Sequence, residues 1–298
     1  SNIAGAISNC QEIQLDTKIF ISSSNGQDTQ QGTIESPMAT FDAAYKKASD
    51  GDTIILMPGT YTEQFLYYSG KNVSLASLFL INEIRDNIHN TIIEVNSSNT
   101  FQEPTDSQIT NNQEDASYDI SIIGLTFMLN DEFSGIDFIN SKINIDNCYF
   151  SGINIFSPAN TKQNAINVNT NSDFFISNST FSDLEGDNLI FVGDESKLTI
   201  FKSVFYNNYV FDKNYALIEG IDNSIIVINN STFVSNYSSE PNKRFIVYLE
   251  NQSTVNKLTN SIQINGVKPF VGVVPAFPAA MFSIKKTFSF IESFGDSL

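Results

Sequence analysis

The chain of 298 residues is long enough for one large all-β domain or two ordinary domains, and it is 41% hydrophobic, with 25 Phe and 11 Tyr to form a core. Only 16% of the residues are charged, and 33 acidic residues against 16 basic ones give a net charge of −17. A field of this sign repels nucleic acid and anionic membranes, and no apolar run reaches the length of a membrane span. Nucleic-acid binding and direct membrane insertion are therefore not expected.

The N-terminal segment, residues 1–17, precedes the first predicted strand and carries one of the two cysteines. Cys10 and Cys148 could form a disulfide that ties this segment to the middle of the chain, or they could be two small buried residues. The sequence does not fix the distance between them, so both alternatives stay open. Neither cysteine has a neighbouring His, which argues against a thiol nucleophile.

The next stretch, Phe20 to Glu63, contains a strand, a Gly-Thr turn and a short helix predicted at about residues 40–48. Thr40 is of a type that caps helix N-termini, and Asp42 in the first turn complements the helix dipole. The apolar residues of this helix fall on one stripe. Such a helix can lie across the open end of a barrel of strands and cover their unpaired edges.

The same stretch resembles the opening of the pectin-lyase-like superfamily of right-handed parallel β-helix proteins. The matching features are the turn at Gly32, then Pro37, "GDTI" (Gly51 to Ile54) and "PGTY" (Pro58 to Tyr61). The resemblance implies a β-helix domain over residues 18–265 with the helix as its N-terminal cap. It implies little about activity, because the superfamily includes lyases, hydrolases, esterases, epimerases, adhesins and phage spikes.

The second half of the chain repeats a pattern in which alternating apolar residues end in Phe, as in "FFISNSTF" and "IVINNSTF". Alternating β-branched and aromatic residues indicate strands, and a period that varies between 23 and 31 residues indicates a solenoid whose loops differ in length. The predicted fold class is all-β, a single-stranded parallel β-helix, right-handed as the resemblance implies. The repeats end at Phe127, Phe150, Phe181, Phe205, Phe233 and, in a degraded copy, Ile262.

Coils of such a solenoid stack about 4.8 Å apart, so equivalent residues should form ladders. The repeated Phe residues are expected to stack inside the barrel. The polar residue three positions before each Phe marks a corner, because Asn tolerates a left-handed backbone. Asn147, Asn178 and Asn230 occupy this corner, and Lys202 interrupts it. Beside the Phe stack, small residues are expected at Leu125, Cys148, Ser179, Ser203 and Ser231.

The resemblance to lyases implies an Arg or Lys as the catalytic base, with Ca²⁺ or basic side chains to neutralise a uronate carboxylate. The candidates for the base are Lys142, Lys202 and Arg85, and no cluster of basic residues in the sequence supports them. The Gly-His-Gly and Arg-x-Lys motifs of related hydrolases are absent, and the one histidine, His89, is expected in a turn. The sequence therefore favours a protein without catalysis.

Asp183, Glu185 and Asp187 stand at alternate positions in "SDLEGDN" and could supply the oxygen ligands that Ca²⁺ prefers. A solvated acidic loop explains the same pattern and is the commoner case. No other cofactor is expected.

Seven asparagines head N-x-S/T sequons, which are acceptors for N-linked glycans if the source is a secretory eukaryote. Asn178 and Asn230 lie in the predicted corner ladder with their amides expected to point inward, so a glycan is less expected there. Scarce Lys and abundant Asn, Ser and Thr also favour an extracellular or cell-surface protein. The sequons predicted in outward positions or turns are those of Asn72, Asn96, Asn229, Asn236 and Asn251.

The tail, residues 266–298, departs from the repeat and is rich in Val and Phe, so we expect it to cap the C-terminal end or to pack on another chain. Self-assembly through residues 268–298 would make the protein a repeating subunit. The sequence favours a non-catalytic extracellular scaffold, structural or adhesive, such as a subunit of a filamentous or cell-surface glycoprotein. The alternatives are a polysaccharide lyase or related enzyme acting on a uronic-acid polymer, and carbohydrate binding without cleavage.

Overall fold

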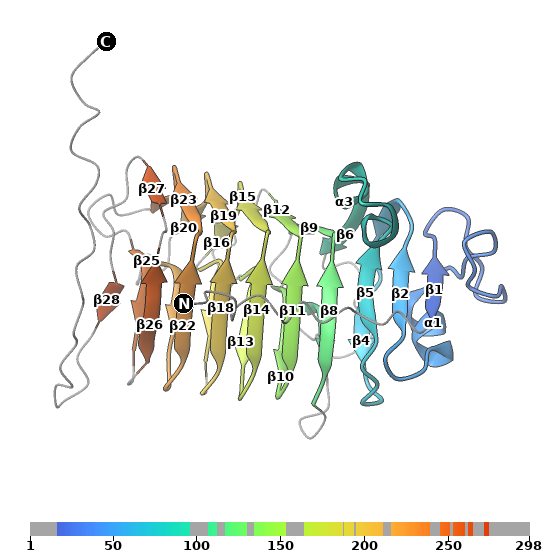
Figure 1. Ribbon diagram of the computed structural model, residues 1–298, viewed down its shortest axis with the longest axis horizontal. Coiled ribbons are helices and arrows are strands. Elements are labelled where there is room, and N and C mark those ends of the chain that lie inside the picture. Colours follow the sequence, from blue (N-terminus) through green and yellow to red (C-terminus); the bar gives the residue numbers. More distant parts are fainter. Residues whose placement is uncertain are drawn as a thin grey trace, which may run out of the picture.

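The chain forms a solenoid of β-strands whose coils stack along one long axis (Figure 1). Strands pair in parallel in every sheet, and successive coils contribute neighbouring strands to each of three long sheets. This is the predicted right-handed parallel β-helix, so the fold class is confirmed. The computed structural model describes residues 17–95, 107–111, 117–129, 134–152, 164–186, 188–193, 195–210, 216–238, 245–250, 253–259, 262–264 and 271–273.

Three long sheets form the sides of the solenoid, and a short fourth sheet follows the second one. The first sheet consists of β1 (Lys18–Ile21), β2 (Thr53–Leu56), β5 (Ser74–Ser77), β8 (Asp119–Ile123), β11 (Lys142–Asp146), β14 (Asp173–Ser177), β18 (Lys197–Phe201), β22 (Ile225–Asn229) and β26 (Thr254–Thr259). The second consists of β3 (Gly59–Tyr61), β6 (Thr91–Val95), β9 (Thr126–Leu129), β12 (Tyr149–Ser151), β15 (Thr180–Ser182), β19 (Val204–Tyr206), β23 (Thr232–Val234) and β27 (Ile262–Ile264). The third consists of β4 (Phe65–Tyr67), β7 (Ser107–Asn111), β10 (Ser134–Ile139), β13 (Ile166–Asn169), β17 (Ile190–Val192), β21 (Ala216–Gly220), β25 (Phe245–Leu249) and β28 (Val271–Val273). The fourth consists of β16 (Glu185–Gly186), β20 (Tyr209–Val210) and β24 (Tyr237–Ser238).

The predicted aromatic stack lies inside the second sheet. The rings of Phe127, Phe150, Phe181, Phe205 and Phe233 follow one another at centroid distances of 4.7, 4.5, 4.7 and 4.7 Å and are nearly parallel. All five side chains are buried. Since the spacing of the rings equals the spacing of the coils, each Phe packs on its equivalents above and below, and the ladder is confirmed.

The small-residue stack next to the Phe ladder is also present and carries hydrogen bonds that the sequence did not predict. The hydroxyl of Ser179 accepts a bond from the backbone N of Cys148 at 3.1 Å, and Ser203 and Ser231 each accept the equivalent bond from the coil before, at 3.3 and 3.2 Å. A backbone N–H that the corner removes from the sheet is thus paired inside the barrel. Serine suits this position because it is both small and an acceptor.

The corner between the first and second sheets has the left-handed backbone that the sequence predicts. Asn147, Asn178, Lys202 and Asn230 have φ values of 52°, 49°, 49° and 52°, and Gly124 in the coil before has 67°. Lys202 adopts the same backbone as the asparagines, so the corner is set by the coil geometry and Asn is the residue that tolerates it best.

A second serine ladder, which the sequence analysis missed, lies where the third sheet returns to the first. Its hydroxyls accept bonds from the backbone N of the coil before, for example Ser172 from Ser141 at 3.3 Å and Ser196 from Ser172 at 3.1 Å. Each of these serines precedes a strand of the first sheet by one residue, a spacing that would have revealed the ladder. The buried members are Ser141, Ser172, Ser196, Ser224 and Ser253.

Helix α1 (Phe41–Lys47) lies beside β1 at the N-terminal end of the solenoid (Figure 1). Thr40 is its N-cap and accepts a hydrogen bond from the backbone N of Ala43 at 3.2 Å. The buried Phe41 ring lies 5.0 Å from the ring of Phe65 in β4. The helix predicted at residues 40–48 is therefore present, and its role as a cap of strand edges stays a prediction.

Several boundaries differ from those predicted. Helices α2 (Phe79–Asn82) and α3 (Asp86–Asn90) form an insert between β5 and β6, and α3 contains His89, which was expected in a turn. Strand β7 lies in the stretch from Glu103 to Asp119, whose composition predicts a long loop, and β28 lies within the predicted tail, where it pairs with β25. The remainder of the tail and residues 1–16 lie outside the described residues, so its capping or self-assembly role stays a prediction.

The last repeat is shifted by one residue from the predicted alignment. Gln263, and not Ile262, stands opposite Phe233 in the backbone register. The cause is an extra residue in β26, where the register with β22 shifts between Ile226 and Val227. In the described part of the chain, no helix has the length and apolar character to span a membrane.

Candidate functional site

The three candidate bases lie on different parts of the solenoid. Lys142 begins β11 on the outer side of the first sheet, where its Nζ lies 2.9 Å from Asp119 Oδ2. Lys202 sits at the corner four coils beyond the helical insert that holds Arg85, a separation of about 19 Å along the axis. The Lys202 ammonium lies 4.9 Å from the ring of Phe201. The structure therefore does not bring these cations together in one groove.

The predicted Ca²⁺ ligands are not assembled among the residues that can be placed. No group of three His, Cys, Asp or Glu side chains that could hold a metal occurs there. Asp183 adopts a left-handed turn, and its Oδ1 accepts a bond from Asn207 Nδ2 at 2.6 Å. Glu185 begins β16 two residues later, while Asp187 lies outside the described residues. The calcium site stays a prediction without structural support.

Cys148 is a free thiol inside the barrel, in the small-residue stack. Burial raises its pKa to about 12, so the thiol is protonated and a poor nucleophile at neutral pH. Its expected partner in a disulfide, Cys10, lies outside the described residues, and the pairing stays a prediction.

The structure buries the side chain of Asn236, where the sequence places a glycan in an accessible turn. Its side chain is 2% exposed and belongs to an internal amide ladder. Nδ2 donates to the carbonyl of Phe205 at 2.9 Å, and Oδ1 accepts from the backbone N and the Nδ2 of Asn208 at 3.1 and 2.8 Å. A glycan on this nitrogen would require the coil to open. The repeated dipeptide Asn-Tyr, three residues after Phe205 and again after Phe233, is the signal that could have revealed this ladder.

The expectation that the corner asparagines point inward is wrong. Asn178 and Asn230 are exposed, because a left-handed residue at an outward corner directs its side chain to solvent. Asn178 Nδ2 donates to Asp146 Oδ1 at 2.7 Å across one coil, so the amide bonds along the outer surface. The asparagines of the two sequons that were expected to be least accessible, Asn178 and Asn230, are therefore more accessible than Asn236.

The other sequons divide between bonded, half-buried and undescribed positions. Asn229 is half-buried on the outer side of β22. Asn72 is half-buried, and its amide donates to Asp50 and accepts from the backbone N of Asp119. Asn96 and Asn251 lie outside the described residues. Modification of these residues stays a prediction.

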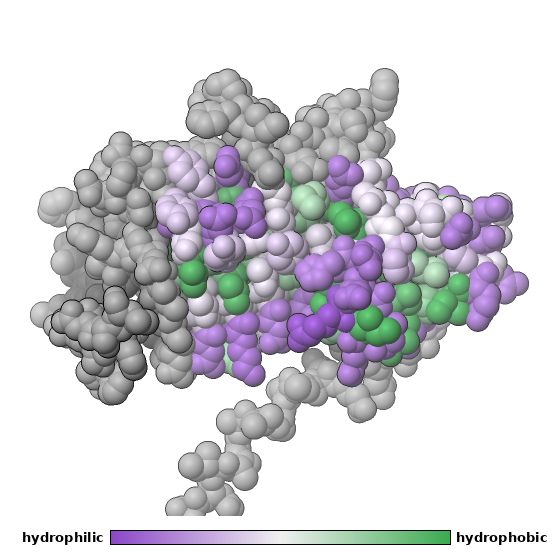
Figure 2. Space-filling model, turned by 90° about the horizontal axis from the view of Figure 1, so that it is seen from above, coloured by the Kyte–Doolittle hydropathy of each residue, from purple (hydrophilic) through white to green (hydrophobic). Residues whose placement is uncertain are grey.

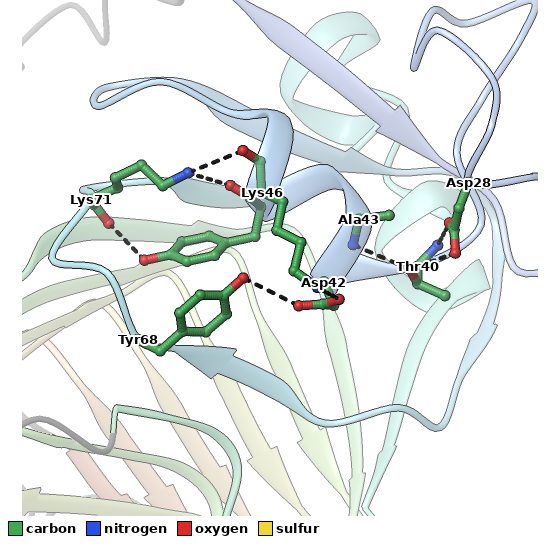
Figure 3. Close-up of polar contacts among 8 residues, drawn as sticks. Asp28, Thr40, Asp42, Ala43, Lys46, Tyr68 and Lys71 are labelled. Carbon is green, nitrogen blue, oxygen red and sulfur yellow. Dashed lines mark hydrogen bonds and ion pairs between the residues drawn. The ribbon is translucent and has the colours of Figure 1, made fainter.

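A group of polar side chains surrounds both ends of α1 (Figure 3). Asp28 Oδ1 accepts from the backbone N of Thr40 at 2.9 Å, and Glu63 Oε1 accepts from the backbone N of Phe41 at 2.9 Å. Burial raises the pKa of the Glu63 carboxyl to about 7, and the nearby carboxylates of Asp28 and Asp42 contribute to the rise. These carboxyl groups satisfy N–H groups that the first turn of a helix leaves unpaired, so they have a structural role.

The opposite end of α1 is held by a lysine (Figure 3). Lys71 Nζ donates to the carbonyls of Tyr45 and Ala48 at 2.5 and 2.8 Å and lies 4.8 Å from the centre of the Tyr45 ring. Its positive charge complements the negative end of the helix dipole. The whole group therefore fixes α1 to the solenoid and does not form a reactive centre.

The outer side of the second sheet has a different character from the rest of the surface. Strands β9, β12, β15, β19 and β23 contain no charged residue, although the protein has 33 acidic and 16 basic residues. In the four later strands the central Phe is buried and its two neighbours lie on the outer side, where Ser182 alone is buried, in contact with the Tyr149 hydroxyl. We call the outward set the uncharged face; its residues are Tyr149, Ser151, Thr180, Ser182, Val204, Tyr206, Thr232 and Val234.

The uncharged face consists of two rows parallel to the axis of the solenoid. Tyr149, Thr180, Val204 and Thr232 are register partners in the first row, and Ser151, Ser182, Tyr206 and Val234 are partners in the second. Figure 2 looks onto this side, where pale, weakly polar surface and small hydrophobic patches lie between hydrophilic areas. Apolar groups and hydroxyls thus lie next to one another along a repeating surface.

The most exposed members lie toward the C-terminal half of the face. Val204 and Tyr206 are 38% and 47% exposed, so this strand presents two large apolar or aromatic side chains to solvent side by side. The Tyr149 hydroxyl lies 2.6 Å from Ser182 Oγ and its ring lies 5.2 Å from that of His89 in α3. The helical insert therefore borders the face at its N-terminal end.

Comparison with known proteins supports the fold and no more. No protein-family model matches the chain, and no curated protein matches it significantly in sequence. The chain is similar to the solved structure of pectate lyase Pel9A, with 15% identity and a TM-score of 0.50 over 81% of this chain and 61% of that one, so it spans less than two thirds of that lyase. A pectin methylesterase from Aspergillus niger is similar over 86% of this chain and 83% of that one, with 13% identity and a TM-score of 0.49. The resemblance to pectin-lyase-like β-helix proteins is confirmed at the level of fold.

Proposed function

We propose that the protein binds a carbohydrate polymer along the uncharged face and does not cleave it. The observation that carries this proposal is the charge-free outer side of the second sheet from β9 to β23, with exposed Tyr206 and Val204 among hydroxyl groups. Sugar rings present apolar C–H faces that pack against aromatic and aliphatic side chains, and hydroxyl edges that exchange hydrogen bonds with Ser, Thr and Tyr. Each row of the face offers both kinds of group.

The repetition of the face also fits a polymer better than a compact ligand. Equivalent residues recur once per coil, about every 4.8 Å. A chain of repeating units can meet the same chemical environment at successive coils, whereas a globular partner has no reason to match this period. An extracellular or cell-surface location, which the sequence predicts, fits this role and stays a prediction.

The other two functions have less support. A lyase needs a base beside cations, and Lys142, Lys202 and Arg85 are held apart. The comparison with solved structures does not support the non-catalytic scaffold that the sequence favours, because pectate lyase Pel9A, which is similar in fold, is an enzyme that acts on a carbohydrate. Carbohydrate binding uses the long repetitive surface that a lyase or a scaffold would also have, and it requires no cluster of reactive side chains.

Binding assays with a matched pair of variants test the proposal. Tyr206→Ala should weaken binding of a soluble polysaccharide about tenfold, since an exposed aromatic contact contributes about 1–1.5 kcal/mol. Phe175→Ala is the control, because Phe175 is a similarly exposed aromatic, at 38%, on the outer side of the first sheet. Equal loss in both variants, or no binding by the wild-type protein to any polysaccharide, would contradict the proposal.

Cleavage is tested separately. The wild-type protein incubated with polygalacturonate or alginate, with and without Ca²⁺, should release no unsaturated product. Release of such a product that disappears in Lys142→Ala, Lys202→Ala or Arg85→Ala would replace binding by a lyase function and identify the base.

A further inference from the structure

We infer that the ligand of the uncharged face is a neutral glycan that lies parallel to the axis of the solenoid. This inference rests on the proposed function and adds the charge of the ligand and its direction.

The charge of the ligand follows from the distribution of charged side chains. A uronic-acid polymer carries a carboxylate on each unit, and binding it requires a cation or metal ion close to each one. The strands of the uncharged face supply neither Lys nor Arg. Among the described residues beside the face, Lys202 lies at one corner and Asp183 and Glu185 follow β15 on the other side, while the helical insert at the Tyr149 end carries Arg85 and Asp86. These groups do not place a cation at each coil of the face.

The outer side of the first sheet shows that this solenoid can carry charged side chains on an outward row. There Asp119, Lys142, Asp173 and Lys197 alternate in sign at one register position, with ion pairs of 2.9 and 3.4 Å. These charges neutralise one another along the axis. On the uncharged face no such groups exist, and the net charge of −17 repels a polyanion from the whole molecule. A neutral glycan meets neither penalty.

The direction follows from the rows of the face. Four coils contribute to each row, so a row from Tyr149 to Thr232 is about 14 Å long, enough for an oligosaccharide of a few units. A glycan crossing the sheet would contact two outward residues in one coil. A glycan along the axis that lies over the two rows would contact side chains in all four coils, including Tyr149 and Tyr206, and helix α3 would border it at the Tyr149 end.

Polymer charge is tested with full-length protein and two sets of probes. Hydroxyethyl cellulose, galactomannan and dextran are the neutral polymers, and polygalacturonate and alginate are the anionic ones. At least one neutral polymer should bind about tenfold more tightly than either anionic polymer, with an affinity that does not change between low and high salt. Tighter binding of polygalacturonate or alginate would overturn the inference and leave the proposed function standing. If none of the five polymers binds, both the proposed carbohydrate binding and the inference of a neutral ligand are wrong.

A charge inserted into the face provides a second, independent readout. Thr180→Lys places a cation in the middle of the first row, and Thr199→Lys, on an outward position of the first sheet, is the matched control. Thr180→Lys should weaken the neutral polymer several-fold and strengthen polygalacturonate at low salt only, whereas Thr199→Lys should do neither. Equal effects of both lysines would show that net charge, and not this face, governs binding.

Direction is tested by two tyrosines two coils apart. Tyr149→Ala and Tyr206→Ala should both weaken a long neutral polymer, and a short oligosaccharide should lose sensitivity to one of them. Thermal melts of both variants show whether each remains folded. If only Tyr206→Ala affects the long polymer in folded protein, the glycan crosses the sheet and the axial direction is wrong.

Discussion

The first and second sheets are built alike on the inside and differently on the outside. Inside, each presents a ladder of large apolar side chains, such as Phe174 in the first sheet and Phe181 in the second, both fully buried. Outside, the first sheet carries the alternating row of Asp119, Lys142, Asp173 and Lys197, while the strands from β9 to β23 of the second carry no charge.

The difference separates the requirements of folding from those of function. Stacked coils demand that equivalent inward residues fit one another, because each packs on copies above and below. Outward residues meet solvent and are free to vary at little cost in stability. A solenoid with a net charge of −17 could have placed acids on any outer side, and the strands from β9 to β23 carry none, which is why the proposed binding site is placed there.

The largest expected effect tests the common interior of the two sheets. Phe181→Ala and Phe174→Ala should each lower the free energy of unfolding by about 3–5 kcal/mol, because both leave a cavity in a packed ladder. Phe175→Ala, one residue away but outward, should change it by less than about 0.5 kcal/mol. Denaturant unfolding measures all three. A small loss in either buried variant would show that its ladder contributes little.

A smaller effect on stability is expected from the buried carboxyl of Glu63, which bonds to α1 at the N-terminal end of the solenoid. The pKa of Glu63 is raised to about 7 in the folded protein, so the folded state binds its proton more strongly than the unfolded chain. Its contribution to stability is present below pH about 4.5 and is lost as the pH rises through about 7. Glu63→Gln keeps an acceptor for the backbone N of Phe41 and should raise the free energy of unfolding at pH 8 by about 1–3 kcal/mol.

The matched measurement for Glu63→Gln is the same unfolding experiment at pH 4. There the variant and the wild type should be equally stable, because the wild-type carboxyl is already protonated in the folded state. A variant that is equally stabilised at both pH values, or at neither, would contradict a buried carboxyl with a raised pKa. Any pH dependence of the free energy of unfolding that remains in the variant comes from ionisable groups other than Glu63.

A still smaller effect concerns the charged row of the first sheet. Lys142→Ala removes an exposed ion pair with Asp119 and should change the free energy of unfolding by less than about 1 kcal/mol, and less again at high salt. Melts at low and high salt measure it. A large, salt-insensitive loss would mean that the row stabilises the fold and that the two outer sides differ for structural reasons.

The last prediction involves no change in stability. In protein secreted from a eukaryotic host, peptide mapping should find Asn236 without a glycan, because both its amide nitrogen and oxygen are bonded inside the coil. Asn178 and Asn230 are exposed and remain open to modification. A glycan at Asn236 in folded protein would show that the internal amide ladder is wrong.

The sequence by itself determined the interior of this protein. Periodic Phe, small residues beside it and a left-handed corner predicted the β-helix, the aromatic stack and the backbone at Asn147, Asn178 and Asn230. The helix near residues 40–48 could also be predicted, from its cap at Thr40 and its apolar stripe. These features depend on local geometry and on a period, and both are written in the order of the residues.

Only the tertiary structure decided the outer surface. The direction of a corner side chain depends on how one coil packs on the next. The sequence analysis expected Asn178 inside the barrel and Asn236 on its surface, whereas the structure exposes Asn178 and buries Asn236. The stacking of coils also separates Lys142 from Lys202 and places Tyr149 and Tyr206 on the same face. Register partners 21 to 47 positions apart become neighbours when coils stack, and only that stacking decides which outward groups meet on one side.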